Sequence, residues 1–413
     1  MTFGFAKHRL LCGCVAVGFA LQPFSEVHAE TDIQPSFRLN GWSGNRLNND
    51  DGGTLSGEIW VRARTTITPT VSAKLEAWAG TDPAALRNVG GDVREGFATV
   101  DVGGVTLNIG RQLLAWGRAD RINPTDMVSA RDLRRLVEEE EENRLGIGAV
   151  SASAPFAGGT LSAYWLPEFR ASKLPQDLAA NGLSVLRRRR VNSENDFAIR
   201  YERFGSKIDF SVTYANIADR LPWLTVVAGP NNQPALQTRH PKMQMFGADI
   251  ATTIGRFGLR AEAAAYTYKK NEIGQFSTGK PRFAGVIGVD RSFSGQWSVI
   301  LQGVVRVSDR TLVTGPNFRV AERNSQIHGS WKPVIVGGFA RVKKGFAGDR
   351  ASAELAGAVL SGGGRFGQLK MSYIVRDSVK LHLLVERYNG RKNSYLGRLK
   401  RNNLIMLGLK AGF

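Results

Sequence analysis

Cysteine is nearly absent from this chain of 413 residues. Its two cysteines, Cys12 and Cys14, both lie in the first 29 residues, and none follows. Once that segment is removed, the chain can form no disulfide framework, no thiolate metal site and no cysteine nucleophile. The fold of the remaining chain is therefore expected to form without covalent cross-links.

The first 29 residues have the pattern of a secretory signal peptide. Lys7 and Arg9 form a basic start, residues 10–21 form a short apolar stretch, and Val27-His28-Ala29 fits a cleavage site of the small-x-small type. We therefore predict a signal peptide at 1–29 and a single mature domain at 30–413.

The chain also lacks any apolar run of about twenty residues, the length that a membrane-spanning helix needs. Its hydrophobic content is 42% and its mean hydropathy is −0.19, which are values of a water-soluble protein. A transmembrane β-barrel gives the same averages, because its strands alternate lipid-facing and lumen-facing residues. Composition alone does not separate the two classes.

Histidine is scarce as well. The predicted mature chain has three, His240, His328 and His382, and none stands in a recognisable motif beside a serine or an aspartate pair. No spacing of His, Asp and Glu is typical of a metal site. The sequence thus predicts no enzyme, no metal and no cofactor.

Only about seven residues, Glu30 to Ser36, precede the first predicted strand, which is too few for a plug domain.

Segments of period-two alternation, separated by turn signals, recur along the whole chain. They predict eighteen strands at 36–46, 55–68, 71–80, 93–102, 104–112, 145–155, 159–167, 194–204, 206–217, 242–254, 256–269, 281–293, 296–309, 328–344, 349–360, 365–376, 378–389 and 402–413. The first, fourth and fourteenth have the weakest pattern, so sixteen strands is the alternative. The predicted fold class is all-β, a transmembrane antiparallel barrel.

The lengths of the connections alternate with strand number. Links of a few residues follow the even-numbered strands, for example Pro69-Thr70, Gly103 and Gly255. Long segments follow most odd-numbered strands, at 81–92, 113–144, 168–193, 218–241, 270–280 and 310–327, while 47–54 and 361–364 are shorter. A barrel with both termini in the periplasm needs tight turns at one end and longer loops at the other. A soluble sandwich has no reason to sort its loops in this way.

Alternation also assigns the faces of each strand. In 58–68, for example, Ile59, Val61 and Ile67 face outward, against Arg62 and Arg64 inward. A barrel of this strand number is too wide for side chains to fill, so an aqueous lumen is expected. The basic residues predicted to line it are Arg62, Arg64, Lys74, Arg260, Arg306, Arg341 and Lys370.

The last ten residues alternate too, with Phe413, Ala411, Leu409, Leu407 and Ile405 on one face. This end resembles the C-terminal assembly signature of bacterial outer-membrane proteins. The resemblance implies recognition by the barrel assembly machinery. The alternative interpretation of this segment is an ordinary edge strand of a soluble domain.

The longest connection, 113–144, carries the strongest functional signal. After Pro124, a cap at Thr125 or Asp126 and the helical apolar spacing of residues 127–137 predict a short helix in this third outer loop. The loop bears charged groups of both signs, and these are the predicted pore-constriction residues: Arg131, Arg134, Arg135, Glu138, Glu139, Glu140, Glu141 and Glu142. The alternative is an outer loop whose charge run is solvated.

Two resemblances bear on this loop. It is similar in order and length to the loop after the fifth strand of general porins, which folds into the barrel and sets the pore width. The stretch Gly110-Arg111-Gln112, Trp116-Gly117, then Asn123-Pro124-Thr125-Asp126, resembles a family of proteobacterial porin-like outer-membrane barrels. These resemblances imply a channel or transporter in the outer membrane, and the general porins suggest a homotrimer.

Basic residues exceed acidic ones, 55 Lys+Arg against 36 Asp+Glu, for a net charge of +19. Cations in the lumen would concentrate anions, whereas loop cations such as residues 187–190 could bind lipopolysaccharide phosphates. A secreted barrel has no nucleic-acid partner. The sequence therefore predicts passive diffusion of small polar, anionic solutes. An exporter for polysaccharide or hydrophobic compounds is the alternative, and a structural or adhesin barrel ranks third.

Overall fold

The computed structural model describes residues 30–44, 54–81, 89–135, 137, 139–174, 184–186, 196–268, 282–308, 318–330, 332–391 and 394–412. The predicted signal peptide, the basic run at 187–190, Glu138 and Phe413 lie outside the described residues.

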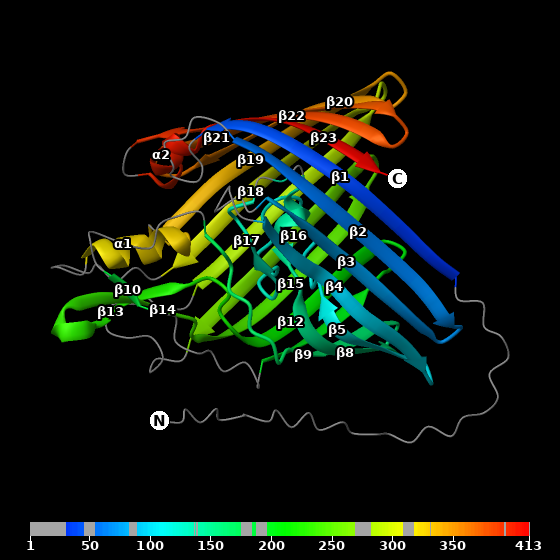
Figure 1. Cartoon of the computed structure of the whole chain (residues 1–413), viewed down its shortest axis with the longest axis horizontal. Helices are drawn as coiled ribbons and strands as arrows, with labels where there is room; N and C mark the ends of the chain where they lie inside the picture. Colours follow the sequence, from blue (N-terminus) through cyan, green and yellow to red (C-terminus); the bar gives the residue numbers. More distant parts are fainter. Residues whose placement is uncertain are drawn as a thin grey trace, which may run out of the picture.

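Eighteen antiparallel strands form one closed barrel (Figure 1). Its strands are β1 (Glu30–Gly44), β2 (Thr54–Thr68), β3 (Val71–Thr81), β4 (Val89–Val102), β5 (Val105–Gln112), β8 (Ile147–Phe156), β9 (Gly159–Trp165), β11 (Phe197–Arg203), β12 (Ile208–Ala218), β15 (Lys242–Ile254), β16 (Phe257–Tyr268), β17 (Arg282–Phe293), β18 (Trp297–Ser308), β19 (Val334–Phe346), β20 (Ala351–Leu360), β21 (Gly364–Arg376), β22 (Val379–Gly390) and β23 (Leu404–Gly412). Each pairs with its neighbour in the sequence, and β1 pairs with β23, for instance Leu39 with Leu409. Closure leaves no open edge.

The predicted count of eighteen is confirmed, and most predicted strands coincide with observed ones to within a few residues. The main differences are at two strands. The first begins at Glu30 rather than at residue 36, so the residues predicted to precede it belong to β1. The fourteenth begins at Val334 rather than at residue 328. Residues 328–330 instead complete the turn after α1 (Phe318–Ile327), where the Ser330 N–H donates to the Ser325 carbonyl.

The sorting of turns and loops is also as predicted. Tight turns such as 69–70, 103–104 and 255–256 join the strands at one end, where the start of β1 and the end of β23 also lie (Figure 1). Small elements decorate the loops at the other end: α1, α2 (Tyr395–Arg398) and a sheet of β10 (Ser184–Leu186), β14 (Pro234–Arg239) and β13 (Trp223–Ala228).

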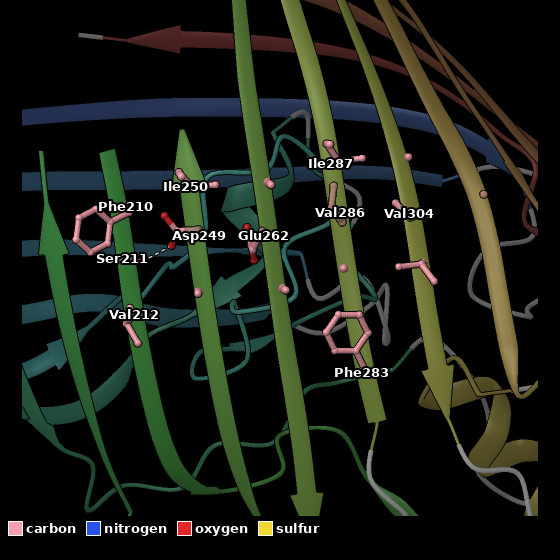
Figure 2. A pocket seen from close by; sticks show the side chains of 17 residues that line it. Phe210, Ser211, Val212, Asp249, Ile250, Glu262, Phe283, Val286, Ile287 and Val304 are labelled. Atoms are coloured by element: carbon pink, nitrogen blue, oxygen red, sulfur yellow. Dashed lines mark hydrogen bonds between the residues drawn. The ribbon is translucent and has the colours of Figure 1, made fainter. Parts of the chain in front are cut away.

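Large apolar side chains cover the outer face of the barrel. Ile59, Ile287, Leu301, Leu355 and Leu407 are each at least half exposed, and all lie at outward positions of their strands. Figure 2 shows one stretch of this wall, where Phe210, Val212 and Phe283 lie on the outer face. Asp249 and Glu262, on neighbouring strands, belong to the lumenal face. The barrel thus presents an apolar belt that suits a bilayer.

No helix among the described residues is long and apolar enough to cross a membrane.

The face assignment can be tested by placing a charge on either side of one strand. Ile59 of β2 is 60% exposed on the outer face, whereas Thr66 of the same strand faces the lumen. Ile59→Lys should destabilise the barrel in liposomes by about 2–4 kcal/mol if the residue lies near the bilayer midplane, because a lysine on the lipid face is poorly solvated. Urea unfolding followed by heat-modifiable gel migration measures this. Thr66→Lys is the control, and equal destabilisation of both variants would contradict the assignment.

Candidate functional site: a loop folded into the lumen

The segment 113–146, between β5 and β8, folds inward and packs against the barrel wall. Val128 of this loop is fully buried, and with Leu114 and Trp116 it joins a core cluster of wall residues. The wall contributes Ile147, Ala198, Ala215, Met243, Met245 and Ala264 to that cluster, among others. These wall side chains point into the lumen, so the loop lies inside the barrel.

One carboxylate on the wall holds the start of the loop. Glu262 of β16 accepts hydrogen bonds from the backbone N–H groups of Arg118, Ala119 and Thr125 at 3.1, 3.2 and 2.7 Å, and from the Thr125 hydroxyl at 2.8 Å. Gly117 makes the approach possible: its φ is +92°, and a Cβ there would stand 2.4 Å from a carboxylate oxygen of Glu262. The backbone of the loop is therefore wrapped around Glu262.

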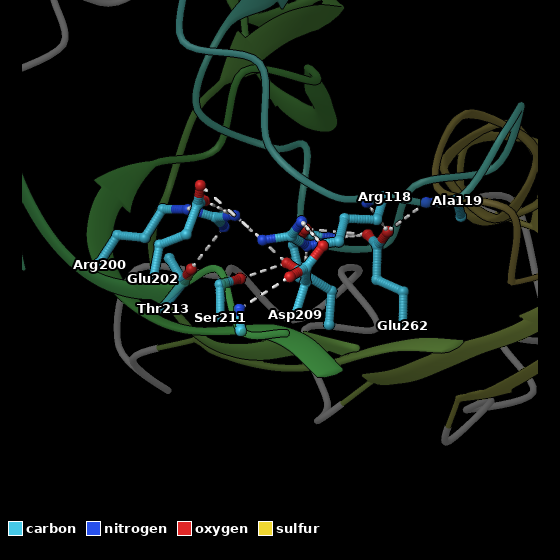
Figure 3. A network of polar contacts seen from close by, with 11 residues as sticks. Arg118, Ala119, Arg200, Glu202, Asp209, Ser211, Thr213 and Glu262 are labelled. Carbon is cyan, nitrogen blue, oxygen red and sulfur yellow. Dashed lines mark hydrogen bonds and ion pairs between the residues drawn. The ribbon is translucent and has the colours of Figure 1, made fainter. Parts of the chain in front are cut away.

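The side chain of Arg118 extends this contact along the wall, as Figure 3 shows. Its Nε donates to Asp249 at 2.6 Å, and its guanidinium lies 3.8 Å from Glu202 and from Asp209. Arg200 donates to Glu202 at 2.7 Å and to Asp249 at 3.3 Å. Two guanidiniums thus balance a cluster of carboxylates from β11, β12 and β15.

The end of the loop is tied to the opposite flank of β5, at β1 to β4. Arg135 donates to both carboxylate oxygens of Glu58 at 2.7 Å, and its guanidinium lies 3.8 Å from the centre of the Trp78 ring. Glu142 pairs with Arg38 at 2.6 Å. Each of these guanidiniums lies over an indole ring while it pairs with a carboxylate. The planar group of arginine can make both contacts at once, whereas the ammonium of lysine cannot pair with two carboxylate oxygens in this way.

Two parts of the loop, residues 120–121 and Glu139, reach the far wall of the barrel. Asp120 pairs with Arg341 of β19 at 2.9 Å, Arg121 donates to Gln368 of β21 at 3.1 Å, and Glu139 accepts from Lys370 of β21 at 2.8 Å. In the order of eighteen strands, β5 is the fifth and β19 the fourteenth, so they stand on opposite sides of the barrel. The loop therefore crosses the lumen.

The predicted constriction residues all belong to this loop, but most serve as ties. Arg131 pairs with Asp126 at 2.5 Å and Arg134 with Asp132 at 2.9 Å, both inside the loop. Arg135, Glu139 and Glu142 bind the wall as described above. Glu141 is exposed and its carbonyl accepts from Arg94 at 2.7 Å, while Glu140 lies in a short helical turn.

The predicted helix position within the loop was wrong. The loop does contain a short helical turn, but it is the 3₁₀ turn η1 (Glu140–Asn143) and not residues 127–137. Residues 130–131 form the short strand β6 (Ala130–Arg131) and residues 133–134 form a turn. The polar groups of this backbone pair with distant partners: the Asp132 N–H donates to Asn143, the Leu133 N–H to Lys173, and the Lys173 N–H to Arg131. These bonds replace the local ladder of a helix.

The seven residues predicted to line the lumen occupy inward positions of their strands. Five of them have an acidic partner: Arg62 with Glu76, Lys74 with Glu95, Arg260 with Asp290, Arg341 with Asp120 and Lys370 with Glu139. Arg64 is exposed in the lumen, and Arg306 donates to the Gly329 carbonyl at 3.3 Å. The wall is thus less uniformly basic than the sequence suggested.

Sequence reasoning missed the carboxylates that receive the loop, Glu58, Asp249 and Glu262. Each stands at a lumenal position of its strand, so alternation could place it inside. Only the folded structure shows which loop group each one meets. The signal on the loop side was the motif Trp116-Gly117-Arg118, whose residues form the Glu262 and Asp249 contacts.

A second buried cluster joins the outer loops above this site. Asp219, between β12 and β13, accepts from Trp223 at 3.1 Å and from Tyr268 at 2.8 Å. The ring of His328 stacks on Trp223 with centroids 3.8 Å apart, and its Nε2 lies 3.2 Å from the Pro222 carbonyl. Burial lowers the pKa of His328 to about 3, against the opposing attraction of Asp219, so this imidazole is neutral at neutral pH. Within the described part of the chain, no group of His, Asp and Glu could hold a metal ion.

Gly117→Ala tests the Glu262 contact. The added Cβ meets Glu262 and demands a left-handed backbone, at a cost of about 1–2 kcal/mol for the conformation alone. We expect the loop to leave its position, so that trypsin cleaves the folded protein within 118–144. The control is Gly103→Ala, another glycine with positive φ whose Cβ would meet nothing within 4 Å. Equal protection of Gly117→Ala and the native chain would contradict the contact.

The His328 cluster should loosen in acid. Because the folded pKa is about 3 and the reference value is 6.5, the open state binds the proton first as the pH falls below 6.5. The free energy of opening should then fall by up to about 1.4 kcal/mol per pH unit, visible as lower protection factors, the intrinsic exchange rate divided by the observed rate, for the amides of 219–228. His328→Phe keeps an aromatic ring beside Trp223 and should remove most of this dependence; an unchanged dependence would assign it to another group.

The fold can be compared with solved structures. OccAB1 of Acinetobacter baumannii has a TM-score of 0.58 at 10% identity, covering 93% of this chain and 96% of that one. The outer membrane protein OpdK of Pseudomonas aeruginosa has a TM-score of 0.58 at 12% identity, covering 93% and 99%. At identities this low, the TM-scores and the coverage show a common fold and nothing more. With the closed barrel and its apolar belt, they identify an outer-membrane β-barrel of bacterial type.

No curated protein sequence matches this chain. Residues 90–340 match the family described as "Protein of unknown function (DUF1302)". That match spans β4 to β19 and includes the whole folded-in loop with its Glu262 contact. Because it covers more than half of the chain, the protein belongs to the DUF1302 family.

Proposed function

We propose that the protein is a channel for passive diffusion of small polar solutes across the outer membrane, with a preference for anions. One observation carries the proposal: the loop 113–146 leaves β5, crosses the lumen and contacts β19 and β21 on the opposite wall. A segment in that position narrows the cross-section of a barrel that its own side chains cannot fill.

The solved structures of similar fold support this proposal. They include OpdK of Pseudomonas aeruginosa with vanillate, a small aromatic carboxylate, at 13% identity and a TM-score of 0.55. The net charge of +19 supports the anion preference, as do the exposed Arg64 on the wall and Arg121 at the crossing point of the loop. A positive lumen raises the local concentration of anions.

Arg121 offers the sharpest test of this proposal. Its guanidinium spans to Gln368 and lies over the Phe366 ring, 4.9 Å from its centre. In planar bilayers, Arg121→Ala should raise the single-channel conductance, because it removes a side chain that reaches across the lumen. Arg121→Gln combined with Arg64→Gln should shift the reversal potential under a salt gradient toward cation selectivity.

Arg203→Ala is the matched control, because Arg203 is an exposed arginine at the end of β11, beside a tight turn and away from the loop. It should leave conductance unchanged. If Arg121→Ala leaves the conductance of a well-folded barrel unchanged, the loop does not set the width of the path. Absence of any channel steps from the native protein would refute the proposed diffusion role itself.

A further inference from the structure

A cavity of 370 Å³ lies between the folded-in loop and the wall formed by β16 to β19. The loop contributes Ile122, Pro124 and Met127 to its lining, and the wall contributes Val286, Val304 and Ile335, among others. Residues 327–329, at the end of α1, cover one side. The volume is at the lower end of the range for small-molecule sites, about 300–1,000 Å³.

The wall of this cavity is apolar at positions that face the lumen. Val286 and Ile335 are 6% and 4% exposed, and Phe339 on β19 continues the same surface. Lumen-facing positions of a water-filled barrel are ordinarily polar. Packing against the loop explains part of this burial. On this side the cavity between loop and wall is lined by hydrocarbon, so this side favours an apolar group.

Two guanidiniums stand at one side of the same cavity. Arg282 is 8% exposed, its nearest carboxylate is Asp219 at 3.8 Å, and its Nε is buried with no hydrogen-bond partner. Arg306 also lines the cavity. Two guanidiniums beside an empty volume, one of them 3.8 Å from its nearest carboxylate, point to an anionic group.

We infer that this cavity is a binding site for amphipathic organic anions, compact molecules with one carboxylate and an apolar body. The carboxylate would lie at the guanidiniums of Arg306 and Arg282, and the apolar body against Val286, Val304 and Ile335. The inference rests on the proposed channel function, since the ligand reaches the cavity through the lumen, and it narrows the solutes to this chemical class.

Equilibrium dialysis of 4-butylbenzoate against the purified barrel tests the site, with empty micelles as the blank. Saturable binding is expected for 4-butylbenzoate and not for 4-butylbenzyl alcohol, which lacks the charge, or for acetate, which lacks the apolar body. Val286→Thr with Val304→Thr keeps the shape and replaces two methyl groups by hydroxyls, so affinity should fall by about tenfold or more. Arg306→Gln should cause a loss of similar size.

Val212→Thr makes the same exchange on the lipid-facing side of β12 and should bind as the native protein does. Native-like affinity of both the Val286/Val304 variant and Arg306→Gln, in barrels that keep their heat-modifiable migration, would overturn the site. So would equal binding of the alcohol. Arg306→Gln keeps the test decisive if the double variant does not assemble.

Bilayer recordings separate this inference from the proposed function. Channel steps without saturable binding of 4-butylbenzoate would leave the channel standing and refute the site. Saturable binding that the cavity variants weaken, from a protein that gives no channel steps, would establish the site and refute diffusion.

Discussion

A single carboxylate, Glu262, holds the start of the loop inside the barrel. Glu262 accepts four hydrogen bonds from the loop, three of them from backbone N–H groups. Bonds from N–H groups to a carboxylate are stronger than bonds between neutral groups. The dependence is mutual: without the loop, Glu262 would stand beside Asp249 without these donors, and without Glu262 the buried N–H groups would lack acceptors. Gly117 is the residue that lets the two approach.

The other contacts between loop and wall fix where the loop lies more than they add to the free energy of folding. Burying an ion pair costs desolvation energy that the attraction between the charges often only offsets. A pair such as Arg38 and Glu142 or Arg135 and Glu58 is satisfied in one placement of the loop, and moving the loop would separate the two charges. The ties at β1 to β4, at β15 and β16, and at β19 and β21 therefore select one conformation of the loop across the lumen.

Local alternation explains how much of the fold could be predicted. Strand ranges, faces and the sorting of loop lengths each depend on neighbouring residues in the chain, and the sequence predicts them well. The bulge in β4 could not be predicted: Arg94 is an extra residue opposite Glu76 and Ala77, so that Arg94 and Glu95 are both buried. Arg94 then pairs with Glu76 and donates to the loop backbone at Glu141.

The candidate site was predictable in its location and not in its contacts. Position and length identified the loop 113–144, but its charges were expected to line a passage, whereas Arg135 and Glu142 are buried against the wall. The helical spacing of Met127 and Ala130 led to the wrong prediction of a helix, because it reflects burial against distant parts of the chain. Met127 packs against the core cluster of loop and wall, Ala130 is fully buried, and the backbone of residues 131–133 bonds to Lys173 and Asn143. Long-range partners of this kind leave no periodic signal.

These ties also make the lumen chemically asymmetric. The sides at β1 to β4 and at β11 to β16 carry paired charges. The side at β17 to β19 carries Arg282, Arg306 and Arg341 and also an apolar patch, formed by Val286, Val304, Ile335 and Phe339. The field of a close ion pair falls off faster with distance than that of a single charge, so the paired cations attract anions over a shorter range than their number suggests. Excess cations such as Arg64 act at long range, while the apolar side and the paired side act on contact. A solute that crosses such a lumen is sorted by the distribution of its charged and apolar surfaces as well as by its net charge.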